Sequence, residues 1–173
     1  MNATPSADHR RHRTQAARLL AMSPRRRDIA WRDLALVPDW ALGERTAVNR
    51  LAVAAGVRAH AAALRRCIDG RVLKHLCAQL GEPAMDALIG HDDADAATGM
   101  ETLDPIEHDI DARLLATGRD WLLASVESPV LRESLRELLW PDAGPGLRAL
   151  NAKSAARVVE AARAALELKE IAA

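Results

Sequence analysis

The segment from Leu51 to Gly90 constrains the fold of this chain more than any other. It begins inside an alanine-rich apolar stretch, residues 45–68, whose apolar side chains recur at helical spacing. A helix this apolar is largely buried, so other elements must pack around it. Gly70 and Gly81 follow at short intervals, and glycine is typical of helix ends. The sequence therefore predicts a long buried helix with short helices and tight turns around it.

The composition favours an all-α fold. Leucine and alanine must fill the interior because the chain has no Phe and no Tyr. Both residues are strong helix formers, and the β-branched residues that favour strands are few. A chain of this length buries about 70% of its unfolded surface without help from a metal or a disulfide. We therefore expect a single compact multi-helix domain with short interhelical turns. The four aromatic residues are expected to be core and turn anchors: Trp31, Trp40, Trp121 and Trp140.

Local signals predict where several helices begin and end. A short helix is expected over residues 13–22, and Ser23-Pro24 predicts the start of another that runs toward Pro38. Gly70 is expected to end the long helix in the left-handed conformation. Further starts are predicted where a capping side chain precedes the helix, at Asp104-Pro105, Ser128-Pro129 and Asn151.

Charge is balanced over the whole chain but unevenly distributed along it. Lys and Arg total 24, and so do Asp and Glu. Residues 1–32 contain eight arginines and two acids, whereas residues 91–111 contain eight acids and neither Lys nor Arg. The two segments could attract each other within the chain or between copies, or be a disordered tail and a solvated loop. We expect residues 1–12 to be a disordered basic tail and residues 13–173 to be a helical domain.

Four residues have side chains that bind metals, but their spacing does not favour a common site: His60, Cys67, His75 and Cys77. Along one helix, His60 and Cys67 lie about 10 Å apart, whereas zinc requires donors at about 2.0–2.3 Å. His75 and Cys77 are two residues apart and so point to opposite sides of a helix. We expect no metal ion and no cofactor. The two cysteines have no CxxC spacing, and we expect reduced, buried and inert thiols.

Catalytic motifs are not evident in the chain. It has no GxSxG elbow and no phosphate-binding or dinucleotide-binding glycine loop. Metal-dependent phosphohydrolases use a His-Asp pair, and the chain contains two such pairs, His91-Asp92 and His108-Asp109. The first pair directly follows a helix-ending glycine, however, and the acid of the second is explained by the dipole of a helix start. We expect no enzyme, no catalytic residue and no small-molecule substrate.

One stripe of basic residues is a candidate binding surface. Arg50, Arg58 and Arg65 are separated by eight and seven residues, so they return to nearly the same angle around a helix. Such a stripe is either a solvated helix face or a rim that contacts an acidic partner. We take these three arginines as predicted partner-binding residues. Charge reversal at Arg58 and Arg65 is then expected to weaken binding without unfolding the protein.

The arginine-rich N-terminus has a second interpretation. Arginines neutralise phosphates, but the segment has no aromatic residue for base stacking before Trp31. The pI near 7 also disfavours a nucleic-acid surface over the whole chain. We do not expect nucleic acid as the principal partner. No apolar segment follows the arginines as in a secretory signal, and no run is long enough for membrane insertion.

Two stretches of the chain contain distinctive motifs that are mainly packing patterns. The first contains an apolar helix that runs into residues 63–68, then Gly70 and a leucine-bearing helix, then residues 80–82 and 85–89. The second comprises residues 114–124, followed by residues 131–141. Together they cover about half of the chain. In these motifs the chain resembles the SctK/YscK-type accessory proteins of bacterial type III secretion and their HrpB-cluster relatives.

The resemblance implies a mostly helical, non-enzymatic cytoplasmic adaptor at the cytoplasmic face of the inner membrane. Family members join the sorting platform beneath the injectisome. They connect the cytoplasmic domain of the SctD-type inner-membrane ring protein to the SctQ-type pod protein. The family has no catalytic residues to transfer to this chain. The alternative is a small helical regulator or chaperone-like protein, and nucleic-acid binding through the arginine-rich N-terminus is one form that it could take.

Overall fold

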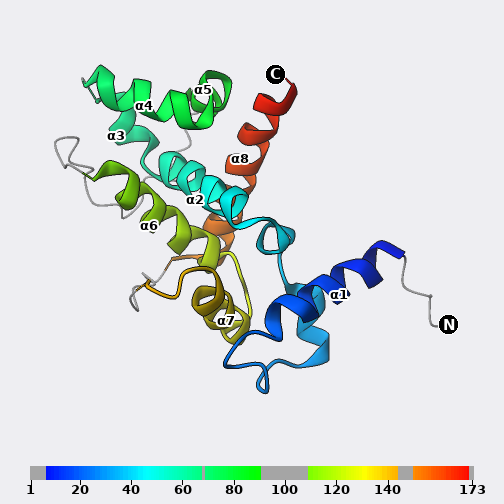
Figure 1. Cartoon of the computed structure of the whole chain (residues 1–173). Coiled ribbons are helices and arrows are strands. Elements are labelled where there is room, and N and C mark those ends of the chain that lie inside the picture. Colours follow the sequence, from blue (N-terminus) through cyan, green and yellow to red (C-terminus); the bar gives the residue numbers. More distant parts are fainter. Residues whose placement is uncertain (1–6, 68, 91–108, 144–149, 172–173) are drawn as a thin grey trace. The chain divides into compact units, whose positions relative to one another are not determined.

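The computed structural model describes residues 7–67, 69–90, 109–143 and 150–171 (Figure 1). Within these ranges the chain consists of α-helices, two 3-10 helices and the turns between them, without a strand. The predicted all-α fold is therefore confirmed for the described residues. The helix-forming composition explains it, because leucine and alanine fill the core.

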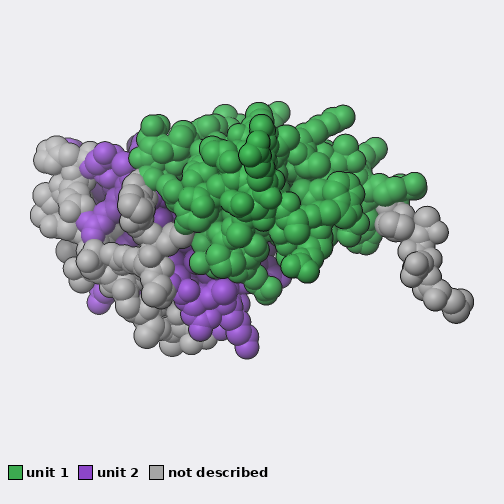
Figure 2. Space-filling model, turned by 90° about the horizontal axis from the view of Figure 1, so that it is seen from below, with its two compact units in different colours: residues 1–48, 126–147 green, residues 49–125, 148–173 purple. Residues whose placement is uncertain are grey.

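The domain is built from two compact units, coloured separately in Figure 2. Unit 1 comprises residues 1–48 and 126–147, and unit 2 comprises residues 49–125 and 148–173. Each unit combines two stretches that are distant in sequence. The boundary expected after residue 12 does not coincide with a boundary between the units.

Unit 1 contains α1 (Ala7–Leu20), η1 (Trp31–Leu36), η2 (Asp39–Leu42) and α7 (Pro129–Leu139). Helix α1 packs against both 3-10 helices. Its contribution to the core is small, because only Ala16 and Leu20 are buried. On α7 the buried side chains are Leu131, Ser134, Leu135 and Leu139, spaced as on one face of a helix.

The expected disorder of residues 1–12 is wrong for residues 7–12, which form the first turns of α1. Residues 1–6 lie outside the described part. The imidazole Nε2 of His12 lies 2.9 Å from the Val37 carbonyl oxygen and 3.3 Å from Asp39 Oδ1. Asp8 in the first turn also suits the helix dipole. Contacts with residues about 25 positions away stabilise a polar segment that its own composition would leave disordered.

Ser23-Pro24 begins a turn and not the expected helix. Ser23 is buried, and its hydroxyl accepts a hydrogen bond from the Arg25 amide at 3.1 Å, while its carbonyl accepts one from Arg26 at 3.2 Å. Proline suits the second position of such a turn as well as the first position of a helix. The chain becomes helical again only at Trp31, as the 3-10 helix η1.

In unit 2, the long predicted helix is divided into α2 (Arg45–Ala59), which begins in unit 1, and α3 (Ala61–Arg65). The division falls at His60, whose φ of −100° and ψ of 15° leave the helical range. Its imidazole Nε2 lies 3.3 Å from the Thr117 hydroxyl. After the bend, α3 packs against α5. The interruption is thus associated with tertiary contacts that helical periodicity does not reveal.

The remaining helices of unit 2 are α4 (Gly70–Leu80), α5 (Glu82–Gly90), α6 (Ile110–Ala124) and α8 (Ala152–Ile171). Helix α8 packs against α5 and α6, and α4 packs against α5 (Figure 1). Gly81 ends α4 at a φ of 96°, a conformation that glycine adopts without steric cost. The prediction that Gly70 ends a helix in the left-handed conformation is wrong. Gly70 begins α4, and Asp69 caps this helix by accepting a hydrogen bond from the Arg71 amide.

The predicted starts at Ser128 and Asn151 are confirmed. The Ser128 hydroxyl accepts a hydrogen bond from the Leu131 amide at 3.4 Å, and Pro129 follows as the first residue of α7. Asn151 Oδ1 accepts one from the Lys153 amide at 2.9 Å, at the start of α8. The predicted start at Asp104 lies outside the described residues. A side-chain cap depends on adjacent residues, and at Ser128 and Asn151, unlike at Ser23-Pro24, the helix that it predicts is formed.

Candidate interaction groove

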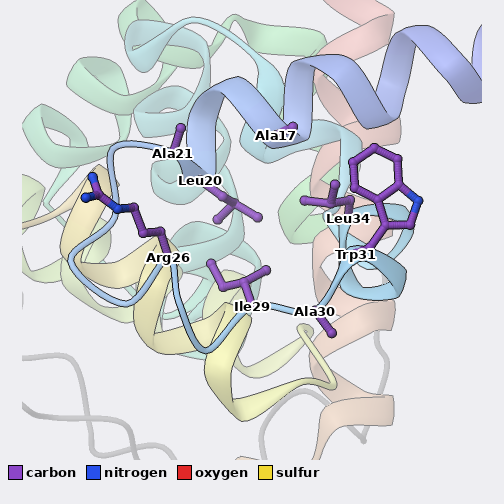
Figure 3. Close-up of a pocket in the computed structure, with 8 residues that line it drawn as sticks. All are labelled: Ala17, Leu20, Ala21, Arg26, Ile29, Ala30, Trp31 and Leu34. Carbon is purple, nitrogen blue, oxygen red and sulfur yellow. The ribbon is translucent and has the colours of Figure 1, made fainter.

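A groove of about 370 Å³ lies in unit 1 between α1, the turn after it and η1 (Figure 3). It is open to solvent along one side. Its volume is at the small end of the range of roughly 300–1,000 Å³ that is typical of ligand sites. The lining is mostly aliphatic, and comprises Ala17, Leu20, Ala21, Arg26, Ile29, Ala30, Trp31 and Leu34.

The charged side chain and the aromatic side chain of the lining lie at opposite ends of the groove. Figure 3 shows Arg26 at one end and Trp31 at the other, with Leu20 and Ile29 between them. Leu20 and Leu34 are buried and form a fixed apolar floor. Trp31 is 70% exposed, far more than a tryptophan that serves as a core anchor. The groove therefore offers apolar surface and an indole ring to a ligand, and the Arg26 guanidinium group lies at its outer end, extending away from Leu20 and Ile29 (Figure 3).

Local hydrogen bonds hold Trp31 at this position. The Ala30 amide donates to Asp33 Oδ2 at 2.9 Å, and the Asp33 amide donates to the Ala30 carbonyl at 2.9 Å. This reciprocal pair of bonds caps η1 at its first residue, Trp31. Three residues complete a 3-10 turn, so Leu34 follows Trp31 on the same side. The buried Leu34 anchors the turn that presents the exposed indole.

The surroundings of the groove are basic. Residues 18–32 contain five arginines and a single acid, Asp28. Arg25 is paired with Glu137, with 3.0 Å between Nε and Oε1, and this hydrogen bond raises the Arg25 pKa. Among the described residues, no acid pairs with the exposed guanidinium groups of Arg26, Arg27 or Arg32. Positive charge at the groove is thus largely uncompensated within the part of the chain described.

Each predicted partner-binding arginine donates a hydrogen bond to a carbonyl in the C-terminal part of another helix of unit 2. An Nη atom of Arg50 donates to the Leu80 carbonyl, the last of α4, at 3.3 Å. Arg58 donates to the Leu88 carbonyl at 2.9 Å, and Arg65 to the adjacent Ile89 carbonyl at 3.1 Å. These carbonyls have no partner within their own helix, and a cation there also suits the helix dipole.

This arrangement corrects the expectation of a solvated arginine stripe. Arg58 is only 4% exposed, so it has almost no surface with which to contact another protein. Arg50 is half-buried, and only Arg65 is exposed. Charge reversal at Arg58 would place a carboxylate beside a buried carbonyl and destabilise the fold. A partner contact by Arg50 or Arg65 stays a prediction.

The four residues considered as metal ligands have other neighbours. His60 lies against Thr117, the Cys67 thiol lies 3.8 Å from the Asp69 carbonyl, and His75 Nε2 lies 2.7 Å from Asp111 Oδ2. Over the described ranges, no three metal-binding side chains gather in one place. His91, Asp92 and His108 fall outside these ranges, so the phosphohydrolase pairs cannot be placed.

Both cysteines are half-buried free thiols. The pKa of Cys77 is raised, first by burial, which disfavours the thiolate, and then by the negative charges of Glu82 and Asp86. A raised pKa lowers the thiolate fraction at neutral pH. Cys77 therefore has the opposite of the electropositive setting in which reactive cysteines occur.

The four tryptophans differ in exposure, which composition alone does not reveal. Trp121 and Trp140 are 4% and 7% exposed and are core anchors as expected. Trp40 is half-buried in η2, whereas Trp31 is exposed and is not an anchor. In the sequence, Trp31 is the first aromatic residue after the arginines, but no sequence pattern predicts the groove beside it. The combination of an arginine cluster with a nearby tryptophan was the available signal of a binding surface.

Comparisons with known proteins identify no relative for this chain. Neither the family models, nor the curated proteins, nor the solved structures contain a match. None of the described helices combines the length and the apolar character needed to cross a membrane.

Proposed function

We propose that the chain is a non-enzymatic adaptor of a bacterial type III secretion sorting platform. It would link the cytoplasmic domain of an SctD-type ring protein to an SctQ-type pod protein at the inner membrane. The resemblance of residues 63–89 and 114–141 to SctK/YscK-type proteins supports this proposal. An adaptor also needs exposed surface suited to protein contacts, and the groove at Trp31 offers such a surface.

The exposed indole of Trp31 beside uncompensated arginines is the observation that carries the proposal. Tryptophan and arginine are the residues most enriched at the energetic centres of protein interfaces. An indole that is 70% exposed gains stability when a partner covers it. The groove is small and open, so it suits contact with a protein side chain better than enclosure of a substrate.

A pull-down with defined partners tests the adaptor function. Immobilised wild-type protein is mixed separately with the cytoplasmic domain of an SctD-type protein and with an SctQ-type protein from the same cell. Capture of both partners is expected, with clear weakening of one of them by Trp31→Ser. Leu168→Ser is the matched control, because Leu168 is also exposed, at 45%, but lies on α8 in unit 2. Failure to capture either partner would refute the proposal.

A nucleic-acid-binding regulator is the second candidate. The exposed arginines along α1 and the turn after it favour this function, because phosphate contacts are made by such side chains. An electrophoretic mobility assay at low salt with duplex and single-stranded DNA and RNA distinguishes it from the adaptor. Binding that falls steeply with salt and is lost in Arg26→Glu would favour the regulator.

A further inference from the structure

We infer that the groove at Trp31 binds an acidic amphipathic helix of a partner protein. An aliphatic side chain of that helix would enter the groove, and a flanking carboxylate would meet Arg26. This inference rests on the proposed adaptor function, because it specifies the chemistry of one of its partners. It concerns unit 1 alone.

The size and lining of the groove define the apolar part of the ligand. A volume of about 370 Å³ that is open to solvent accommodates one or two aliphatic side chains. Leu20 and Leu34 are buried and held in place by α1 and η1, so the floor exists before any ligand binds. Preformed apolar grooves of this kind receive the anchor residues of a helix at i, i+3 and i+4 spacing.

The charges around the groove define the polar part. Arg26 lines the groove itself, and Arg27 and Arg32 are exposed nearby in sequence. Asp28 is the one acid among residues 18–32 and leaves these arginines in excess, and two further acids nearby in sequence are engaged elsewhere. Asp33 accepts the Ala30 amide at 2.9 Å, and Asp39 lies 3.3 Å from the imidazole of His12. Charge complementarity therefore favours a ligand with carboxylates beside its aliphatic anchor.

The same features disfavour the other anionic ligands. A nucleic acid offers phosphates and flat bases but no aliphatic side chain for a concave apolar site. A lipid headgroup surface supplies negative charge, but it lacks a protruding anchor of fixed register for a groove with Arg26 at one end and Trp31 at the other (Figure 3). A helix supplies both groups at a fixed spacing, so it fits best.

Three synthetic peptides of about 18 residues, long enough for measurable helicity, provide the probes. The first has leucines at helical spacing on one face and glutamates on the other. The second has lysine in place of glutamate, and the third has serine in place of leucine. Binding to the full chain is measured by fluorescence anisotropy of the labelled peptide and by Trp emission.

Only the acidic leucine peptide is expected to bind. Trp emission should shift to shorter wavelength on binding, because Trp31 is 70% exposed, whereas Trp121 and Trp140 are 4% and 7% exposed and Trp40 is half-buried. Trp31→Ser should abolish the shift and weaken binding about tenfold, as loss of an aromatic anchor does. Arg26→Glu should weaken binding about tenfold through charge repulsion. Lys153→Glu makes the same charge change at the start of α8 and should leave binding unchanged.

Other outcomes would overturn the inference. Equal binding of the serine peptide would show that the apolar groove has no role. Equal binding by Trp31→Ser and Arg26→Glu, with unchanged circular dichroism, would place the peptide elsewhere. Binding of phosphatidylglycerol vesicles or a single-stranded oligonucleotide through Trp31 and Arg26, without binding of the peptide, would assign the groove to another ligand.

The inference and the adaptor function fail in different ways. Peptide binding without capture of SctD-type or SctQ-type protein would refute the adaptor and retain the acidic helix. Capture of both proteins that is unaffected by Trp31→Ser and Arg26→Glu would retain the adaptor and refute the groove as its binding site.

Discussion

Gly56 on α2 and Gly118 on α6 bring the backbones of the two helices into direct contact. A β-carbon added to Gly118 would lie 2.8 Å from the Gly56 amide nitrogen and would overlap the Ala52 carbonyl. A β-carbon added to Gly56 would overlap the Leu114 carbonyl. Small residues are required wherever two helices approach so closely. This crossing explains why glycine is tolerated in the interior of both helices despite its low helix propensity.

Gly118→Ala is expected to destabilise the protein by about 1–3 kcal/mol, the usual cost of overpacking. Alanine would gain roughly 1 kcal/mol of helix propensity, but the clash is with backbone and cannot be relieved by a rotamer change. Gly70→Ala is the control, because no atom lies within 4 Å of its added β-carbon. Urea unfolding of the two variants measures the difference. Equal free energies of unfolding for Gly118→Ala and Gly70→Ala would show that α2 and α6 are not in contact.

Arg58→Met should lower the free energy of unfolding by about 1–3 kcal/mol. Methionine retains much of the apolar stem but leaves the buried Leu88 carbonyl without the guanidinium donor 2.9 Å away. Arg65→Met is the matched variant, since Arg65 also binds a carbonyl of α5 but is exposed to water. Thermal unfolding monitored by circular dichroism compares them, and a larger loss in Arg65→Met would contradict the assignment.

Alkylation of Cys77 by iodoacetamide is expected to be slower at pH 7 than that of an unfolded-chain thiol. The raised pKa of Cys77 means that less thiolate is present at this pH. The reaction rate should therefore increase at a higher pH than for the denatured protein. A Cys67→Ser background leaves one thiol to follow by mass spectrometry. If the alkylation rate of the native protein increased at a lower pH than that of the denatured protein, the prediction would be refuted.

Asn151→Ala should destabilise α8 by about 0.5–2 kcal/mol, because the amide of Lys153 loses its capping acceptor. Asn151→Asp retains an acceptor oxygen and adds a negative charge at the helix N-terminus, so it should preserve stability or increase it. Hydrogen exchange of the first turn of α8 reports the effect directly. Identical exchange in the alanine and aspartate variants would show that the cap contributes nothing measurable.

The all-α class and several helix boundaries followed from sequence. Leucine and alanine without Phe or Tyr predicted helices, and Ser128, Asn151 and Gly81 marked helix ends that the structure confirms. Capping by a side chain or by glycine depends on a few adjacent residues, so its signal lies within a short window. The same kinds of signal at Ser23-Pro24 and Gly70 did not mark the boundaries expected there, so the local signal alone was not sufficient.

Tertiary structure alone decided the start of α1, the break at His60 and the roles of the arginines. His12 meets Val37, His60 meets Thr117, and Arg58 meets Leu88, across 25, 57 and 30 residues respectively. Helical spacing shows which side chains share a face, but it does not show what that face packs against. The buried Arg58 and the exposed Trp31 therefore contradicted expectations based on residue type. Burial is set by neighbours distant in sequence.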